Sequence, residues 1–351
     1  MCDRSAERAF IGSFTSAGGR GIISAAVDGS TGALKETGAT DAVADPSYLA
    51  IGATDRGRVL YAVSETTEGA VAAFDITEDT AAPRLIGVPA PVRGAGPTHL
   101  AVVGGHVLTA NYTCGSVSVL PVGPDGEPSA AVGVLRHEGR GPHPQRQRGP
   151  HAHQVLPDPT GQWILDVDLG TDSVGVCELD PATGDMSLHR ETALRPGTGP
   201  RHLTFHPSGR HAYVINELEP TLTVCRWDAS EGVLEALGET TVLPGGFAGP
   251  GYASEAAVAH DGRFLWVANR GHDSIAVLGL DASGARAELI TTVPCGGHWP
   301  RDLTLDPTGT RLYAANERSG DVTWFDIDAR SGVPRRAGSI AAPAASCVVF
   351  A

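Results

Sequence analysis

The chain has 351 residues, of which 41% are hydrophobic, enough for a packed core in one large domain or two ordinary ones. Glycine (45 residues) and proline (25 residues) are abundant, which favours a fold with many turns over a helical one. The formal net charge of −14 argues against a nucleic-acid backbone or an anionic membrane as the partner. A small anionic substrate is compatible with this charge, because a local cluster of arginines can override the overall field.

The first ten residues, MCDRSAERAF, carry charges and no apolar run, and no stretch approaches the roughly 18 apolar residues of a membrane span. We therefore expect no signal peptide, no membrane segment and a cytoplasmic location. The six cysteines lie far apart and form no CxxC pair, so we expect reduced, mostly buried thiols and no zinc site: Cys2, Cys114, Cys177, Cys225, Cys295 and Cys347.

The N-terminal part of the chain contains three short segments that we interpret as strands: FIGSFTS (10–16), GIISAAVD (21–28) and DGSTGAL (28–34). Similar segments then recur about every 50 residues, with a shorter last step. The recurring starts are PSYLAI at 46, PTHLAV at 97, PHAHQV at 150, PRHLTF at 200, YASEAAV at 252, PRDLTL at 300 and PAASCVVF at 343. A repeat of this length is typical of a propeller blade.

Each full repeat has the same internal order. A first apolar run leads into a turn such as DPTG (158–161), whose proline and glycine positions are typical of a type I turn. A second run follows, such as AYVIN (212–216), and then a third with strict alternation, such as TLTVCRW (221–227), which indicates a strand. An Asp-to-Gly turn and a weaker fourth strand complete the unit.

The repeat predicts an all-β fold: a seven-bladed β-propeller with four antiparallel strands per blade, forming a single domain over residues 1–351. The N-terminal segments supply strands two to four of one blade, and the C-terminal PAASCVVF supplies its missing first strand. The two termini should therefore share a blade and close the ring, which removes exposed sheet edges.

Several charged residues should meet at one mouth of the central channel. In a four-stranded meander the first strand starts, and the second strand ends, on the same face. His151, His153, Arg201, His202 and Arg301 lie at starts of first strands, and Glu217, Arg270 and Glu317 follow ends of second strands. These side chains come from adjacent blades, so they can surround one small ligand.

Structural roles are the alternative for each of these residues. The histidines could cap strand ends, and the arginines and Glu217 could simply pair with each other between blades. Asn111, Asn216, Asn269 and Asn316 recur at one position, which favours a structural role in the turn. The histidine- and arginine-rich loop 137–153 could be solvated, or it could cover the mouth at which it ends.

Four motifs resemble the seven-bladed propeller lactonase family, which includes propeller-type 6-phosphogluconolactonase and carboxymuconate lactonising enzyme. They are GPHAHQVLPDPTGQWILDVDLGTDSV, GPRHLTFHPSGRHAYVINEL, ASEAAVAHDGRFLWVANRGHDSI and GGHWPRDLTLDPTGTRLYAANE. The resemblance implies a site with one histidine, two arginines and one glutamate. By motif these are His153, Arg201, Arg270 and Glu217. We assign no second acidic residue to the mouth.

The resemblance implies a metal-independent lactonase without a cofactor, acting on a small anionic lactone or carboxylate. Lactone hydrolysis needs a base for water and a cation for the developing oxyanion. We expect His153 and Glu217 to be catalytic, the carboxylate with its pKa tuned upward, and Arg201, Arg270, His151, His202 and Arg301 to bind substrate. Two alternatives stay open: cycloisomerisation of a carboxylated muconate, and a propeller that binds a metabolite or protein without turnover.

Overall fold

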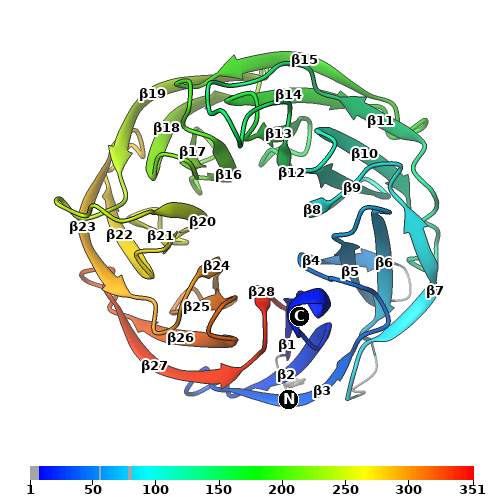
Figure 1. The fold of residues 1–351 in the computed structure, drawn as a ribbon, viewed down its shortest axis with the longest axis horizontal. Helices are drawn as coiled ribbons and strands as arrows, with labels where there is room; N and C mark the ends of the chain where they lie inside the picture. Colours follow the sequence, from blue (N-terminus) through cyan, green and yellow to red (C-terminus); the bar gives the residue numbers. More distant parts are fainter. Residues whose placement is uncertain (1–7, 55–56, 78–80) are drawn as a thin grey trace.

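The computed structural model describes residues 8–54, 57–77 and 81–351. Seven four-stranded antiparallel sheets are arranged as the blades of a ring, with one strand of each sheet next to the central axis (Figure 1). The predicted seven-bladed propeller with four strands per blade is therefore confirmed. The only helix among these residues is the three-residue 3-10 helix η1 (Thr15–Ala17), so no helix there is long enough to cross a membrane.

The strands of each blade follow one another from the axis outward, in the order inner, second, third and outer. The blade formed by both chain ends contains β28 (Ala345–Phe350), β1 (Arg8–Ser13), β2 (Ile22–Val27) and β3 (Leu34–Thr40). The next three blades in chain order contain β4 (Leu49–Thr54), β5 (Gly57–Ser64), β6 (Ala70–Asp75) and β7 (Arg84–Pro91); β8 (Pro97–Val103), β9 (His106–Asn111), β10 (Ser116–Pro121) and β11 (Gly133–Arg136); and β12 (Ala152–Pro157), β13 (Ile164–Asp168), β14 (Ser173–Leu179) and β15 (Met186–Ala193). The last three blades contain β16 (Pro200–Phe205), β17 (His211–Asn216), β18 (Thr221–Asp228) and β19 (Val233–Thr241); β20 (Tyr252–Val258), β21 (Phe264–Arg270), β22 (Ser274–Leu280) and β23 (Ala287–Pro294); and β24 (Pro300–Leu305), β25 (Arg311–Asn316), β26 (Asp321–Ile327) and β27 (Pro334–Ala341).

The two ends of the chain share one blade, as the sequence predicts. Strand β28 pairs with β1 in an antiparallel register that places Phe350 opposite Ala9 and Val348 opposite Ile11 (Figure 1). This pairing makes β28 the inner strand of the blade whose other three strands are β1, β2 and β3. The ring therefore closes through backbone hydrogen bonds, and β1 is not left as an open edge.

The predicted turns are present, with one correction. In the DPTG turn the N–H of Gly161 donates to the carbonyl of Asp158 over 2.9 Å, and Gly309 bonds Asp306 in the same way. The segment DGSTGAL is not a strand: Gly32 donates to the carbonyl of Asp28 in a turn, and β3 begins only at Leu34. Gly32 has a φ of 70°, a left-handed conformation that favours glycine, which explains why this apolar-poor segment turns.

The core lies between neighbouring blades. Tyr213 and Ile215 of β17, for example, pack with Leu265 and Val267 of β21. Alternate strand residues therefore face the next sheet, which is the reason for the period-two pattern in the sequence. Of the cysteines, four are buried and Cys114 is half-buried, all five as free thiols, in line with the expectation; Cys2 lies outside the described residues.

The recurring asparagines have the structural role that their repetition favours. The amide of Asn111 donates to the hydroxyls of Ser116 (3.1 Å) and Ser118 (2.8 Å). The amide of Asn216 bonds two threonine hydroxyls in the equivalent way. These bonds tie the end of the second strand to the start of the third.

A β-bulge near the start of the inner strand recurs in six blades, and it positions the candidate site. In β16, Pro200 lies opposite Asn216 and His202 opposite Ile215, so Arg201 is the extra residue. The extra residues of the other inner strands are Thr98, His153, Arg301 and Ser346, and in β20 the bulge spans Ser254 and Glu255. Bulges re-aim side chains, often at active sites.

Candidate active site

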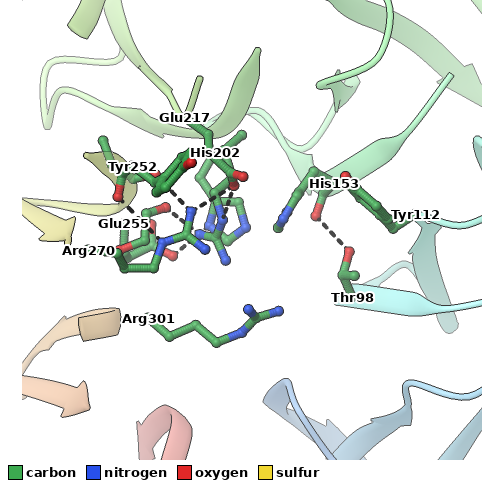
Figure 2. Close-up of polar contacts among 12 residues, drawn as sticks. Thr98, Tyr112, His153, His202, Glu217, Tyr252, Glu255, Arg270 and Arg301 are labelled. Atoms are coloured by element: carbon green, nitrogen blue, oxygen red, sulfur yellow. Dashed lines mark hydrogen bonds and ion pairs between the residues drawn. The ribbon is translucent and has the colours of Figure 1, made fainter. Parts of the chain in front are cut away.

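The residues proposed from the sequence do converge on one face of the ring. His153 from β12, His202 from β16, Arg270 from β21 and Arg301 from β24 extend from different blades toward a common space near the axis, and Glu217 joins them (Figure 2). The rings of His153 and His202 are 5.1 Å apart, centroid to centroid, and Glu217 pairs with Arg270 over 2.7 Å, so these residues lie on one rim. The topological argument for a shared mouth is therefore confirmed.

The first part of the site is a buried glutamate surrounded by arginines, here called the arginine cage (Glu217, Arg146, Arg201 and Arg270). Oε1 of Glu217 lies 2.7 Å from a guanidinium nitrogen of Arg146. Its Oε2 lies 2.7 Å from Nη2 of Arg270 and 3.4 Å from Nε of Arg201. Three positive charges thus meet one negative charge, which leaves this region positive in an acidic protein.

Backbone carbonyl groups hold the arginine cage in place. Arg201 donates to the carbonyl of Ser254, and Nη2 of Arg270 donates to the carbonyl of Ala253 over 3.2 Å. The N–H of Glu217 donates to the carbonyl of Gly199 over 2.7 Å. The two arginines are anchored on the same bulged strand, β20, so their guanidinium groups converge.

The surroundings of the arginine cage shift the pKa of Glu217 and of Arg201 strongly. Burial alone would raise the pKa of Glu217, but the charges of Arg270, Arg146 and Arg201 outweigh burial and lower it to about 2. Burial, together with Arg270 and Arg301, lowers the pKa of Arg201 to about 9. The upward tuning expected for Glu217 is therefore wrong, because three contacting cations stabilise its charged form.

Arg146 brings the loop 137–153 into the site. Its guanidinium also donates to the hydroxyl of Tyr112 over 3.1 Å, and Gln147, which is buried, donates to the carbonyl of Leu169 over 2.8 Å. The loop is therefore not simply solvated: it carries the third arginine of the cage. The sequence indicated the loop but not which of its arginines would reach Glu217.

Beside the arginine cage lie three buried histidines, here called the histidine cluster (His99, His153 and His202). The ring of His202 is 5.1 Å from that of His153 and 5.3 Å from that of His99, centroid to centroid. Burial lowers the pKa of each well below 6.5, and the charge of Arg201 lowers all three further. These imidazoles are therefore neutral at neutral pH, when they can accept protons.

The sequence argument missed two buried acidic residues, of which Glu255 contacts the histidine cluster and Asp302 interacts electrostatically with Glu255. Oε2 of Glu255 lies 2.5 Å from Nδ1 of His202, and Oδ2 of Asp302 accepts a bond of 2.8 Å from the N–H of Val348. Burial raises the pKa of Glu255, and burial and the charge of Glu255 raise the pKa of Asp302. Asp302 has the same register position as His202, two blades further along the chain, and this repeat position is the signal that could have found it.

Several buried polar atoms of the site have no hydrogen-bond partner among the described residues. Such atoms are costly unless something satisfies them, so they point to a bound ligand or water at this position. They are Nδ1 of His99, Nδ1 of His153, Nε2 of His202, Nε of Arg201 and Oγ of Ser346.

The remaining predicted residues differ in their placement. Arg301 reaches the same space, with long ion pairs to Glu317 (3.5 Å) and Glu65 (3.8 Å). His151 precedes β12, stacks on Tyr112, and has its Nδ1 2.9 Å from the carbonyl oxygen of Tyr112. The register explains the difference, because His153 and not His151 occupies the position of Arg201.

A groove of about 710 Å³ opens beside the arginine cage. It lies between the loop around Arg146 and the segment 241–252, so that a ligand in it would contact Arg146 and Tyr252. Tyr252 is linked to the cage because its carbonyl accepts a hydrogen bond of 3.4 Å from Arg270. Among the described residues, no group of three or more His, Cys, Asp or Glu side chains is arranged to hold a metal ion.

Fold and site together define a propeller of the lactonase type. The family model "Lactonase, 7-bladed beta-propeller" matches residues 8–350, and the chain belongs to this family. It is 32% identical to a 6-phosphogluconolactonase of Bacillus subtilis over 345 residues, covering 97% of each chain.

Solved structures give the same family assignment. A putative 6-phosphogluconolactonase from Bacteroides fragilis has a TM-score of 0.91 and 27% identity, covering 100% of this chain and 99% of the other. A periplasmic gluconolactonase from Pseudomonas aeruginosa has a TM-score of 0.90 and 28% identity, covering 99% of each chain. The relatives thus support a lactonase-type enzyme.

Proposed function

We propose that this protein hydrolyses the ester of a small anionic sugar lactone resembling 6-phosphogluconolactone, by metal-independent general acid and base catalysis. The observation that carries the proposal is the arginine cage, with its excess of positive charge, next to neutral buried imidazoles. Guanidinium groups bind phosphate and carboxylate with two parallel hydrogen bonds. The name of the relative from Bacillus subtilis supports the phosphorylated substrate.

The proposed reaction divides the site into two halves. A base removes a proton from water, the water oxygen attacks the acyl carbon, and the carbonyl oxygen becomes negative beside Arg201 or Arg270. The bond from the acyl carbon to the ring oxygen then breaks, and the ring oxygen takes up a proton. Because its pKa is about 2, Glu217 serves better as the counter-ion that holds the arginines than as the base.

The other proposed roles follow from placement. His153 remains a candidate acid or base, because its buried Nδ1 has no partner among the described residues. Arg201, Arg270 and Arg301 are proposed to bind the substrate anion, with His202 beside them. His151 is proposed to act only at the edge of the site, by positioning Tyr112.

The test is hydrolysis of a panel of sugar lactones with and without a phosphate, in the presence of a chelator and corrected for the uncatalysed rate. We expect turnover of phosphorylated members, reduced more than about 100-fold by Arg270→Met. Arg226→Met is the matched control, since Arg226 lies on β18 and is exposed. Turnover of none of the lactones would overturn the proposal. A carboxylated muconate in the same panel tests cycloisomerisation, and binding without turnover would favour a non-catalytic propeller.

We also propose a cytoplasmic location. The five described cysteines are free thiols, which is usual in a reducing compartment. The similar protein from Pseudomonas aeruginosa is described as periplasmic, so cell fractionation with a compartment marker is the test. Recovery with periplasmic markers would contradict this part of the proposal.

A further inference from the structure

The hydrogen bond between His202 and Glu255 distinguishes His202 from the other candidate bases. We propose that His202 accepts the proton from the attacking water through its Nε2, and that Glu255 is the positioning residue that fixes this tautomer. The inference rests on the proposed lactonase function and deepens it. It replaces the expectation that His202 only binds substrate.

The geometry favours one tautomer of His202. A carboxylate accepts hydrogen bonds, so Oε2 of Glu255, 2.5 Å from Nδ1, places the proton on Nδ1 and the lone pair on Nε2. Nε2 is buried and has no hydrogen-bond partner among the described residues. A base whose second nitrogen is oriented by a carboxylate is the arrangement that activates water or a hydroxyl in other hydrolases.

The two bases suggested by the sequence lack this arrangement. Nδ1 of His153 has no hydrogen-bond partner among the described residues, so nothing described on that side fixes its tautomer. Both carboxylate oxygens of Glu217 contact arginines. Of His153, Glu217 and His202, only His202 has both a ring oriented by a carboxylate and a buried nitrogen without a partner among the described residues.

The proposed step conserves atoms and charge. The water proton moves to Nε2 while the water oxygen bonds to the acyl carbon, and the resulting imidazolium is paired with the carboxylate of Glu255. The oxyanion forms next to Arg201, the neighbour of His202 in the chain. When the bond from the acyl carbon to the ring oxygen breaks, Nε2 returns its proton to the ring oxygen, and neutral His202 is restored beside the hydroxy acid.

The pair should also produce a pH limit. Burial raises the pKa of Glu255 above its usual 4.5. Once protonated, Glu255 would donate to Nδ1 and leave the proton of His202 on Nε2, which removes the acceptor. Turnover should therefore fall as the pH drops through this raised pKa. The titratable and charged groups around the pair are Tyr48, His99, His153, Arg201, Glu217, Arg270, Arg301 and Asp302.

The tautomer can be measured without any substrate. In protein labelled with ¹⁵N-histidine, nuclear magnetic resonance at pH 8 should show His202 with a strongly hydrogen-bonded proton on Nδ1 and an unprotonated Nε2. Glu255→Gln should weaken the hydrogen bond and shift that proton signal upfield. A proton on Nε2 of His202 in the wild type at this pH would overturn the assignment, whether or not the protein hydrolyses lactones.

Kinetics then test the catalytic role. His202→Asn should lower kcat about 100-fold or more with KM nearly unchanged, and Glu255→Gln should lower kcat and abolish the acidic limb of the pH profile. The matched control is His106→Asn. His106 is buried, lies at the start of β9, which is the end of that strand away from the candidate site, and has no carboxylate partner among the described residues. It should retain kcat within about tenfold.

The outcomes separate the two proposals. If the wild type is active and His153→Asn abolishes turnover while His202→Asn does not, the base is misassigned and the lactonase proposal stands. If the wild type hydrolyses no lactone of the panel, the proposed function and the catalytic role of His202 both fail, and the resonance experiment still decides the tautomer. Circular dichroism tests whether each variant is folded. If His202→Asn does not fold, the kcat and pH profile of the more conservative Glu255→Gln decide the catalytic role.

Discussion

Glu217 and Glu255 lie in adjacent blades, and both carboxylates are buried, yet their pKa values move in opposite directions. Glu217 contacts three arginines and its pKa is lowered to about 2, whereas Glu255 contacts an imidazole and its pKa is raised. Burial raises the pKa of both, so the number of contacting cations decides the direction. The difference separates two regions on one face of the ring: in one the ionised form of a carboxylate is favoured, and in the other the protonated form is favoured.

The division fits a reaction on an anionic lactone. The arginine cage keeps Glu217 ionised at every physiological pH, so it can hold cations in place while a substrate anion binds. The pKa of Glu255 is raised to about 7, so this carboxylate changes its protonation near neutrality beside a neutral His202. A single buried carboxylate could not serve both purposes, because the cations that bind the substrate would also remove its basicity.

The largest effect is expected for Glu217→Gln, on the free energy of unfolding. The substitution leaves buried arginines without their counter-ion, and removing one partner of a buried ion pair costs about 3 kcal/mol or more. Urea unfolding at pH 7 should show this loss, together with loss of activity.

Glu317→Gln is the matched control for Glu217→Gln, because Glu317 has the same place in another blade. It makes only a longer pair of 3.5 Å with Arg301 and is more exposed. It should cost less than about 1 kcal/mol. Equal losses for the two variants would mean that the arginine cage contributes nothing special to stability.

An intermediate effect is expected from Arg146→Ala. This arginine belongs to a loop, is partly exposed and is one of three cations on Glu217, so the fold should tolerate its loss. It also lines the groove beside the arginine cage. We expect KM for a phosphorylated lactone to rise about tenfold, with kcat changed much less.

The control for this loop arginine is Arg140→Ala, because Arg140 lies in the same loop and is exposed. Its KM should equal that of the wild type. Should Arg146→Ala lower kcat and leave KM unchanged, Arg146 would act on the transition state rather than on substrate binding.

The sequence was sufficient to predict the ring, because period, alternation and turn residues are local signals that repeat seven times. It also placed His153, Arg201, Glu217 and Arg270 together, since the register of a four-stranded meander determines which strand ends meet. Their catalytic and binding roles stay predictions.

What the sequence did not predict depends on contacts between blades. Glu255 lies in a bulge of β20, in a repeat that lacks the usual proline, and its bond to His202 spans 53 residues. The pKa of Glu217 is lowered by Arg270 and also by Arg146, and Arg146 lies in an irregular loop whose contact with Glu217 the repeat does not predict. Counting from the proline aligns His151 with Arg201, whereas the register aligns His153 with Arg201, because Ala152 and not Pro150 has the position that Pro200 has in β16.

The smallest and most discriminating effect is the pH dependence of stability. Because the folded pKa of Glu255 is raised, its contribution to stability is present below the unfolded value near 4.5 and is lost as the pH rises through the raised value. The stability of the wild type relative to Glu255→Gln should therefore fall between pH 4.5 and pH 8, by about 1.4 kcal/mol for each unit by which the pKa is raised, measured by urea unfolding at each pH.

Glu217 should give the opposite trend in the same measurement. Its folded pKa is lowered to about 2, so its contribution is present above pH 4.5 and is lost as the pH falls toward 2. The stability of the wild type relative to Glu217→Gln should thus be constant from pH 8 to about pH 5 and decline below it. Parallel curves for the two variants would show that both carboxylates experience the same environment, and the separation of charge binding from proton transfer would then have no physical basis.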